Sequence, residues 1–244
     1  MARSPSGERG VTTCALVLYA RVPEKGTVKT RLQPFLTPDE SLALHRALIE
    51  DSVRLLRLVA ERAGARPVLS FSADRDPNPS PDNRLAAVSE GIERLPQRAG
   101  DLGQRLAGTL EDLKMQDGAA AVIFGSDSPT LPPEWLESAC AAVVAGTPIV
   151  IGPARDGGYY LIGAPLPAPS LFDGIPWGTD AVLGETLRRA RRAGLTASLL
   201  PPWYDLDRPE DLEHAQRDLT QTGGFAPDRT AAFLRRLVGA GRLS

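Results

Sequence analysis

The chain contains little of what several classes of protein require. Its two cysteines, Cys14 and Cys140, lie in apolar runs without the spacing of a metal site, so we expect two buried thiols in a reducing cytosol. No apolar run approaches the ~18 residues of a membrane helix. Lysine and arginine (28) nearly balance aspartate and glutamate (30), whereas nucleic-acid binders usually carry a basic excess. We therefore expect a cytoplasmic protein that binds neither membrane nor nucleic acid.

The sequence also lacks the common catalytic signatures. Its two histidines, His45 and His214, lie inside helical patterns away from any candidate nucleophile, and we expect them on a helix surface or in a groove. There is no GxSxG elbow, no HExxH motif and no CxxC motif. Hydrolase and redox chemistry therefore lack support.

Hydrophobic residues make up 42% of the 244 residues, enough for a sizeable core in one α/β domain. Short apolar runs alternate with longer helical patterns. Strands are predicted at residues 14–20, 67–73, 120–125, 147–152, 159–164 and 197–201. Helices are predicted from 38 to about 64, 101 to about 114, 132 to about 144, 179–192, 209–219 and 227–238. This order predicts a mainly parallel sheet covered by helices on both faces, which binds ligands at the carboxyl ends of its strands.

Several boundaries have local reasons. Thr37, Pro38 and Glu40 form a capping box that starts the long helix after the first strand. Residues 153–158 between the fourth and fifth strands allow a hairpin or a longer excursion. We expect a disordered tail at 1–10, a main domain at 11–222 and, after glycines 223 and 224, a helical extension at 223–244.

The loop after the first strand is rich in cations. It carries Arg21, Lys25, Lys29 and Arg31 together with Gly26. A loop in this place directs backbone N–H groups and cations at the strand ends, which suits a polyphosphate. The spacing of a P-loop is absent, and a solvated basic loop is the alternative.

Two acidic segments follow later strands. Asp127 comes directly after the strand at 120–125, where a carboxylate can hold Mg²⁺ against phosphate; the alternative is that Asp127 only caps a turn. Asp205 and Asp207 lie on one side of an extended segment, and this pair is a candidate source of a second metal-binding carboxylate. The alternative for Asp207 is an N-cap of the helix at 209–219, with Glu210 as its capping-box partner.

Three further segments give weaker indications. The segment 97–105 opens a helix and is a candidate to contact a base or ribose. The glycines of 155–160 allow either close approach to a ligand or a tight turn. Trp177 in 175–180 is a candidate wall of an acceptor pocket or a cover of the core.

Taken together and in order, these motifs resemble a bacterial family. The matching segments are 23–32 (PEKGTVKTRL), 100–105 (GDLGQR), 125–131 (GSDSPTL), 152–163 (GPARDGGYYLIG), 175–180 (IPWGTD) and 205–212 (DLDRPEDL). They are similar to the DUF2064 family, which is grouped with nucleotide-diphospho-sugar transferases and includes proteins called glycosyltransferases of arsenosugar biosynthesis. The match spans about residues 13 to 220. More distant resemblances are to phospholactate guanylyltransferases and molybdopterin nucleotidyltransferases.

The resemblance implies a GT-A-like, doubly wound, mainly parallel mixed sheet with Mg²⁺ or Mn²⁺ at the centre. Asp127 and Asp207 resemble the metal ligands, and Lys25, Lys29 and Arg31 resemble the loop that grips a triphosphate. The first loop has one glycine where sugar-nucleotide pyrophosphorylases have three, which leaves the type of donor open. Ser126 and Ser128 stand where Ala and Cys are common in the family, and we expect no functional change from them.

The motifs and the resemblance together define three sets of candidate residues. The catalytic set is Lys29, Arg31 and Asp127, with Asp127 and Asp207 as the metal ligands. The nucleotide-binding set is Arg21, Lys25, Gly26, Thr30, Gln97, Gly100 and Asp101. The acceptor-binding set is Asp156, Gly157, Gly158, Trp177, Thr179 and Asp180.

Three functions are compatible with these residues. The first is transfer of a nucleotidyl group from a nucleoside triphosphate to a small anionic acceptor, with release of pyrophosphate. The second is glycosyl transfer from a nucleotide sugar, and the third is nucleotide binding without catalysis. The first is favoured because a loop rich in Lys and Arg suits the extra charge of a triphosphate. A homodimer is one assembly that the sequence allows.

Overall fold

A computed structural model describes residues 14–33, 35–72, 87–117, 120–164, 171–219 and 225–243. The predicted tail at 1–10, a Pro-, Asn- and Asp-rich loop at 74–84, and glycines 223 and 224 lie outside these residues. Cys14 and Cys140 are free and buried, as predicted. Among the helices of the described residues, none has the length and apolar character needed to cross a membrane.

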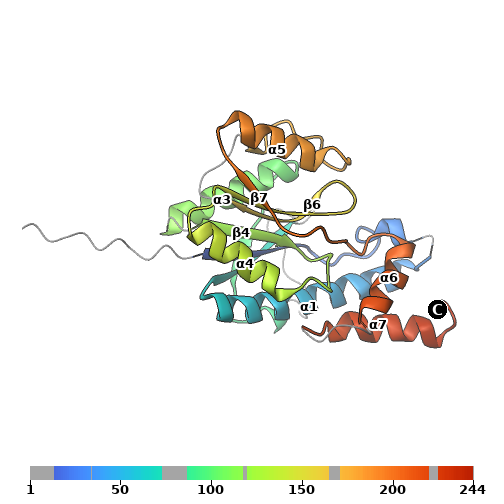
Figure 1. Ribbon diagram of the computed structural model, residues 1–244. Helices are drawn as coiled ribbons and strands as arrows, with labels where there is room; N and C mark the ends of the chain where they lie inside the picture. The colour runs from blue at the N-terminus through green and yellow to red at the C-terminus, as the bar shows by residue number, and fades with distance from the viewer. Residues whose placement is uncertain are drawn as a thin grey trace, which may run out of the picture.

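The centre of the molecule is a seven-stranded sheet with the order β3-β2-β1-β4-β6-β5-β7 (Figure 1). β6 runs antiparallel to its neighbours β4 and β5, and every other pair of neighbours is parallel. The predicted mainly parallel, doubly wound sheet is confirmed. The strands are β1 (Cys14–Arg21), β2 (Arg66–Ser72), β3 (Glu93–Pro96), β4 (Ala120–Gly125), β5 (Ile149–Pro153), β6 (Tyr159–Ala164) and β7 (Ala197–Leu199).

The apolar strands in the middle of the sheet are buried on both faces. In β1, Leu16 and Leu18 pack into the cluster on one face, whereas Ala15 and Val17 pack into the cluster on the other. All four residues have 0% exposure. A near-continuous apolar run is what a strand covered on both sides requires.

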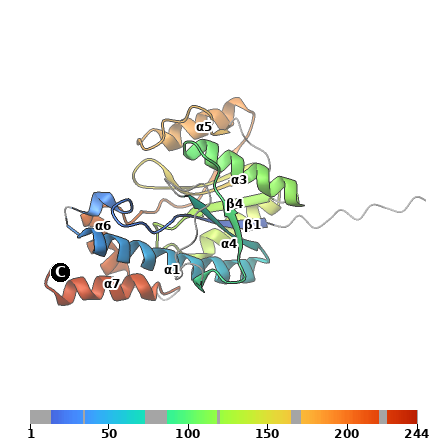
Figure 2. The same ribbon diagram turned by 180° about the vertical axis from the view of Figure 1, so that it is seen from behind.

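Helices cover both faces of this sheet (Figures 1 and 2). α1 (Pro38–Ala63) and α4 (Pro133–Val144) lie on one face, and α3 (Leu102–Asp117) and α5 (Val182–Arg192) lie on the other. α6 (Pro209–Leu219) lies at the end of the sheet near the start of α1. α7 (Asp228–Gly239) forms an outer layer beside α1.

The start of α1 shows why its predicted boundary is correct. The Thr37 hydroxyl accepts a hydrogen bond from the backbone N–H of Glu40 at 3.2 Å, and the Glu40 carboxylate accepts one from the backbone N–H of Thr37 at 2.8 Å. Gly64 ends the helix in the left-handed conformation, with φ at 60°. Both ends therefore follow from local chemistry.

Three predictions are corrected or settled by the structure. β3 was not predicted, because it is a four-residue edge strand whose only buried side chain is Leu95. α5 begins at Val182 and not at residue 179, because Thr179 accepts a hydrogen bond from Ala181 N in a turn before the helix. The segment before Tyr159 is a hairpin, since β5 and β6 pair antiparallel.

α7 is tied to α1 by a buried carboxylate. Asp51 of α1 has 0% exposure and accepts hydrogen bonds from the backbone N–H groups of Arg229 (3.2 Å) and Thr230 (2.7 Å). The first turn of α7 has no capping side chain of its own, so Asp51 caps it from the neighbouring helix. Phe233 and Leu234 then join the same apolar cluster as residues of α1.

Candidate active site

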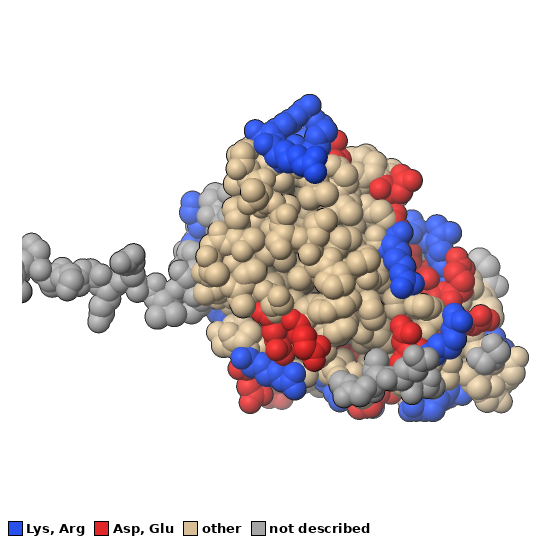
Figure 3. Space-filling model, in the orientation of Figure 1, with Lys and Arg blue, Asp and Glu red and all other residues tan. Residues whose placement is uncertain are grey.

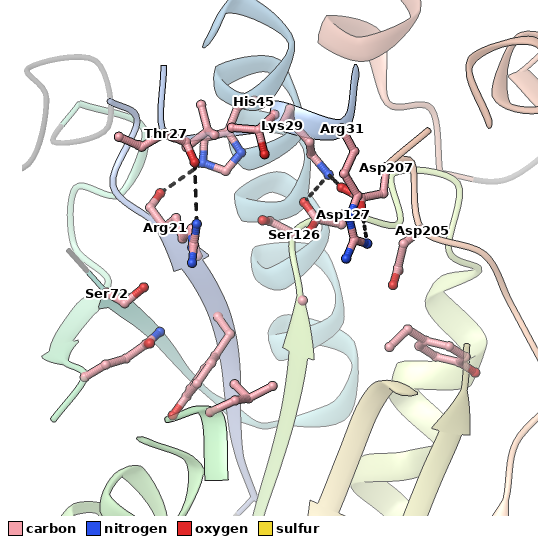
Figure 4. Close-up of a pocket in the computed structure, with 18 of the residues that line it drawn as sticks. Arg21, Thr27, Lys29, Arg31, His45, Ser72, Ser126, Asp127, Asp205 and Asp207 are labelled. Atoms are coloured by element: carbon pink, nitrogen blue, oxygen red, sulfur yellow. Dashed lines mark hydrogen bonds and ion pairs between the residues drawn. The ribbon is translucent and has the colours of Figure 1, made fainter. Parts of the chain in front are cut away.

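A cavity of about 560 Å³ opens at the carboxyl ends of β1 and β4 and beside the start of β6 (Figure 4). This is the edge of the sheet at which a ligand site is expected in such a fold. The members of the three candidate sets that line this cavity are Arg21, Lys29, Thr30, Arg31, Gln97, Asp127 and Asp207.

Lys29 lies at the centre of the charged groups of the cavity. Its ammonium is 2.8 Å from Asp127 Oδ1 and 3.8 Å from Asp207 Oδ1, and it donates a hydrogen bond of 2.7 Å to the carbonyl of Leu206. The side chain is only 3% exposed. Lys29 is also the one non-glycine residue with positive φ among the described residues, at φ 50° and ψ 39°. This left-handed backbone turns the chain so that the side chain points inward.

Asp207 is held by a second cation and does not cap α6. Arg31 Nη1 lies 2.8 Å from Asp207 Oδ2. The Asp211 carboxylate accepts the hydrogen bonds from the backbone N–H groups of Asp207 (3.0 Å) and Arg208 (2.7 Å) at the start of the helix. The Asp207 carboxylate is thereby directed at the cavity (Figure 4).

Asp127 remains ionised in this environment. Burial alone would raise the pKa of its carboxyl group, but the positive charge of Lys29 outweighs this effect, so the net shift of the pKa is downward. Its backbone carbonyl accepts a hydrogen bond of 2.7 Å from Leu206 N. This bond joins the loop after β4 to the segment before α6, and it brings Asp127 and Asp207 to one place.

Asp205 adds a third carboxylate to the same cavity. Burial, followed by the negative charge of Asp127, raises the pKa of Asp205 to about 6. The Ser128 hydroxyl lies 2.6 Å from Asp205 Oδ1 and donates to it. Although the sequence treats Asp205 and Asp207 as alternatives, the structure places both at the cavity. Ser128, expected to have no functional effect, therefore has a definite partner in the site.

The chemistry of this donor set suits a hard divalent cation that arrives with phosphate. Asp127 and Asp207 flank one point, and Mg²⁺ commonly takes one or two carboxylates and completes its coordination with phosphate oxygens and water. In the part of the chain that the structure describes, no group of three or more His, Cys, Asp or Glu residues could hold a metal ion by itself. Asp127 and Asp207 are therefore the two carboxylates that could hold such an ion together with phosphate oxygens.

His45 lies in the wall of the cavity. It is 4% exposed, and its Nε2 lies 3.1 Å from the carbonyl oxygen of Arg21. Burial lowers its pKa, so the ring is neutral at pH 7. Of the two expected positions, helix surface or groove, the structure shows the groove. The contact of His45 with Arg21 could not be predicted from the sequence, because it depends on where β1 ends relative to α1.

Residues proposed for nucleotide binding divide into two groups. Gln97 lines the cavity and donates a hydrogen bond of 3.1 Å to the carbonyl of Ser70. Lys25 pairs with Asp39 at 2.8 Å, and Gly26, Gly100 and Asp101 do not line the cavity either. Asp101 instead caps α3, where its carboxylate accepts a hydrogen bond of 2.9 Å from Gln104 N.

The residues proposed for acceptor binding lie in the turn between β5 and β6 and in the segment before α5, where Asp156, Thr179 and Asp180 are exposed. Gly157 has φ at 92°, and a Cβ atom there would lie 2.3 Å from the carbonyl oxygen of Asp180. The Trp177 ring meets the Tyr159 ring edge-on at 6.2 Å, and Tyr159 lines the cavity. The set Asp156, Gly157, Gly158, Trp177, Thr179 and Asp180 does not line the cavity itself. Tyr159 and Tyr160, which were not selected from the sequence, line it in their place.

The fold and the position of the cavity define a class of protein. The chain has the GT-A-like fold shared by nucleotidyltransferases and nucleotide-sugar transferases. A cytidylyltransferase from Leptospira borgpetersenii shares this fold at a TM-score of 0.54 and 12% identity, over 94% of this chain and 95% of that one. Within this class, the chain belongs to the family of uncharacterized proteins conserved in bacteria, DUF2064, whose model matches residues 55–179.

Two other proteins are similar in sequence. A candidate nucleotide-diphospho-sugar transferase from Desulfovibrio desulfuricans G20 is 28% identical, with a TM-score of 0.80 over 95% of this chain and 98% of that one. A phosphoenolpyruvate guanylyltransferase from Chloroflexus aurantiacus is 30% identical over 151 residues, which are 60% of this chain and 71% of that protein. The resemblance inferred from the motifs is thereby confirmed.

Proposed function

We propose that this protein is a Mg²⁺-dependent nucleotidyltransferase. It transfers a nucleotidyl group from a nucleoside triphosphate to a small anionic acceptor and releases pyrophosphate. The observation that carries the proposal is the arrangement of Lys29 and Arg31 with Asp127 and Asp207 at the carboxyl ends of the strands. Two cations and two carboxylates in one cavity match a triphosphate and its magnesium ion.

In the reaction, an oxygen of the acceptor attacks the α-phosphorus and forms a new O–P bond. The bond from the α-phosphorus to the bridging oxygen breaks, and that oxygen leaves with pyrophosphate. Asp127 and Asp207 would hold Mg²⁺, which supplies Lewis-acid stabilisation of the phosphate charge. Lys29 and Arg31 would bind the phosphate oxygens.

The acceptor needs no general base, because an anionic oxygen is already a nucleophile. This requirement agrees with the environment of His45, whose Nε2 is engaged by a backbone carbonyl. The main contribution of the chain is then to position two ligands and to neutralise charge. We further propose that Tyr159 and Tyr160 border the acceptor side, because both line the cavity and the Tyr159 ring contacts Trp177.

Glycosyl transfer from a nucleotide sugar is the second candidate. The similarity to the Desulfovibrio protein supports it. The same two carboxylates and metal would hold the diphosphate of the donor, and the bond from the sugar to the phosphate would break instead. The cations of the first loop favour the triphosphate, since a diphosphate requires less positive charge.

A binding panel followed by a turnover assay tests the proposal. ATP, CTP, GTP, UTP and common nucleotide sugars would be compared by thermal shift with and without Mg²⁺. Because one similar protein is a phosphoenolpyruvate guanylyltransferase, GTP with phosphoenolpyruvate is the first pair to test for pyrophosphate release. We expect one triphosphate to stabilise the protein only when Mg²⁺ is present.

The variants Asp127→Asn and Asp207→Asn test the assignment of the two metal ligands. Both keep the size of the side chain, and both should lose the Mg²⁺-dependent part of the stabilisation while they remain folded. Stabilisation by a nucleotide sugar alone would favour glycosyl transfer. Binding without turnover of any acceptor would favour the non-catalytic function, and full activity of both variants would contradict the metal assignment.

A further inference from the structure

A second cavity, of about 600 Å³, lies between α1 and α7. Its charged residues are Arg46 and Glu50 from α1 and Arg229, Arg235 and Arg236 from α7. Four arginines face one glutamate there, although the whole chain has a net charge of −2. We call this cavity the arginine groove. Positive charge is therefore concentrated at a place that the proposed reaction does not use.

One face of each helix forms the arginine groove. Arg46 and Glu50 lie four residues apart on α1, and Arg229, Ala232 and Arg236 follow at steps of three and four on α7. Residues at these spacings share a helix face. Alanines lie between the charged residues, so the lining contributes cations and small methyl groups.

The two helices that form the groove are held in place before any ligand binds. The Asp51 carboxylate on α1 caps the first turn of α7 through Arg229 N and Thr230 N. Phe233 and Leu237 are 4% exposed and pack into the apolar cluster that includes Leu48 of α1. Because both helices are already fixed, no free energy is needed to order them when a ligand binds, and this favours affinity.

The cations of the groove differ in how far they are already neutralised. Arg229 Nε lies 3.2 Å from Glu50 Oε2. Arg236 stacks on the Phe233 ring at 5.5 Å, which leaves its guanidinium edge available for hydrogen bonds. Within the described residues, neither Arg235 nor Arg236 has a carboxylate within ion-pair distance. At Arg235 and Arg236, an added anion therefore finds two guanidinium groups whose charge no described carboxylate balances.

We propose that the arginine groove binds a compact chain of phosphates. Guanidinium groups match phosphate oxygens in pairs of hydrogen bonds, and several of them need a ligand with more than one phosphate. No aromatic side chain lines the groove within the described residues, so it offers no ring on which a nucleotide base could stack. The ligand is recognised through its phosphates, whether these are free or belong to a larger molecule.

The groove and the proposed active site are both lined by residues of α1. His45 lines the catalytic cavity, and the next residue of α1, Arg46, lines the arginine groove. α1 thus separates the two cavities. A phosphate ligand in the groove contacts the same helix that carries a wall of the catalytic cavity.

Calorimetric titration of the full-length protein with inorganic tripolyphosphate, at low salt and without divalent cations, tests the proposal. The catalytic cavity is itself expected to bind this probe, so the variant Arg31→Ala is titrated in parallel to identify that event. The double variant Arg235→Ala/Arg236→Ala should bind at the groove at least tenfold more weakly, because it loses two charged hydrogen-bonding groups. The groove event should survive in Arg31→Ala whatever happens at the catalytic cavity.

The matched control is Arg191→Ala/Arg192→Ala. These two exposed arginines lie at the end of α5, where a basic cluster is visible at the top of Figure 3, and their removal changes the net charge equally. This control should leave the groove event unchanged. Equal losses in both double variants would show a general charge effect, and unchanged binding in Arg235→Ala/Arg236→Ala would overturn the proposal.

Two further probes test the class of ligand. Inorganic phosphate should bind the groove at least tenfold more weakly than tripolyphosphate, because it engages fewer guanidinium groups. GTP should bind there no more tightly than tripolyphosphate, since the base gains no contact. Tighter binding of GTP at the groove would contradict recognition through phosphates alone.

Discussion

Replacing Lys29 by methionine removes the ammonium and keeps a side chain of similar length. In the protein, this ammonium lies 2.8 Å from Asp127 and 3.8 Å from Asp207, and it bonds to the carbonyl of Leu206. Its removal leaves two neighbouring carboxylates without the cation between them. Loss of one partner of a buried ion pair costs about 3–5 kcal/mol.

The cost here should be smaller, because water reaches both carboxylates. The Asp127 and Asp207 side chains are 43% and 33% exposed, although Lys29 is only 3% exposed. We therefore expect Lys29→Met to lower the free energy of unfolding by about 1–3 kcal/mol at pH 7, after a discount for solvent screening. Denaturant titration without divalent cations measures this change.

The same substitution should strengthen the binding of a divalent cation. Lys29 occupies the space between the two carboxylates, so a metal ion has to displace it or tolerate its repulsion. Without nucleotide, Mn²⁺ should bind Lys29→Met roughly tenfold or more tightly, since a like charge about 4 Å away costs a few kcal/mol near a protein surface. Electron paramagnetic resonance of free Mn²⁺ measures this affinity without any turnover.

Triphosphate affinity should change in the opposite direction, because the phosphates lose a cation. Arg62→Met is a suitable control, as Arg62 pairs with Glu137 at 3.2 Å away from the cavity. Unchanged stability together with unchanged Mn²⁺ affinity in Lys29→Met would refute the assignment of Lys29 as the cation that holds the site together.

Three further predictions concern other parts of the molecule. Because burial raises the pKa of Asp205 to about 6, the folded state retains this proton more strongly than the unfolded state. The free energy of unfolding should therefore fall as the pH rises from about 4 to about 6. Asp205→Asn should remove about 2–3 kcal/mol of that fall in denaturant titrations with chelator. Gly157→Ala should destabilise the protein by more than Gly26→Ala, because both glycines have positive φ but only the Cβ at position 157 would meet the backbone of Asp180; equal melting temperatures would contradict this packing. Thr37→Ala should cost about 0.5–2 kcal/mol through loss of the capping box, whereas Thr37→Ser should cost less, and thermal unfolding of both variants separates the cap from other effects.

Much of the fold could be predicted because its signals are local. The ends of α1 follow from Thr37, Pro38 and Gly64, and the central strands follow from apolar runs that are buried on both faces. The start of α5 could not be predicted in the same way, because Thr179 satisfies a backbone N–H in a turn before the helix and only resembles an N-cap. β3 depends on pairing with β2, which four residues of sequence do not reveal.

The candidate site could be predicted in part for a topological reason. Parallel strands end at one edge, so the loops after β1 and β4 meet there, and Lys29 and Asp127 meet with them. The sequence could not show that Lys29 lines the cavity whereas Lys25 lies outside it. These two positions depend on the left-handed turn at Lys29 and on the ion pair of Lys25 with Asp39.

The bond from Lys29 to the carbonyl of Leu206 spans 177 positions of the chain. During synthesis on the ribosome, Lys29 and Asp127 therefore leave the exit tunnel well before their partners at 206 and 207. A nascent chain that ends between β6 and β7 contains β1 to β6 but lacks Leu206 and Asp207. It also lacks the Asp211 carboxylate that accepts the hydrogen bond from Arg208 N. Lys29 and Asp127 are then present without Leu206, to which both are hydrogen-bonded in the complete site. The site is therefore incomplete until the segment that contains Leu206 and Asp207 has been synthesised.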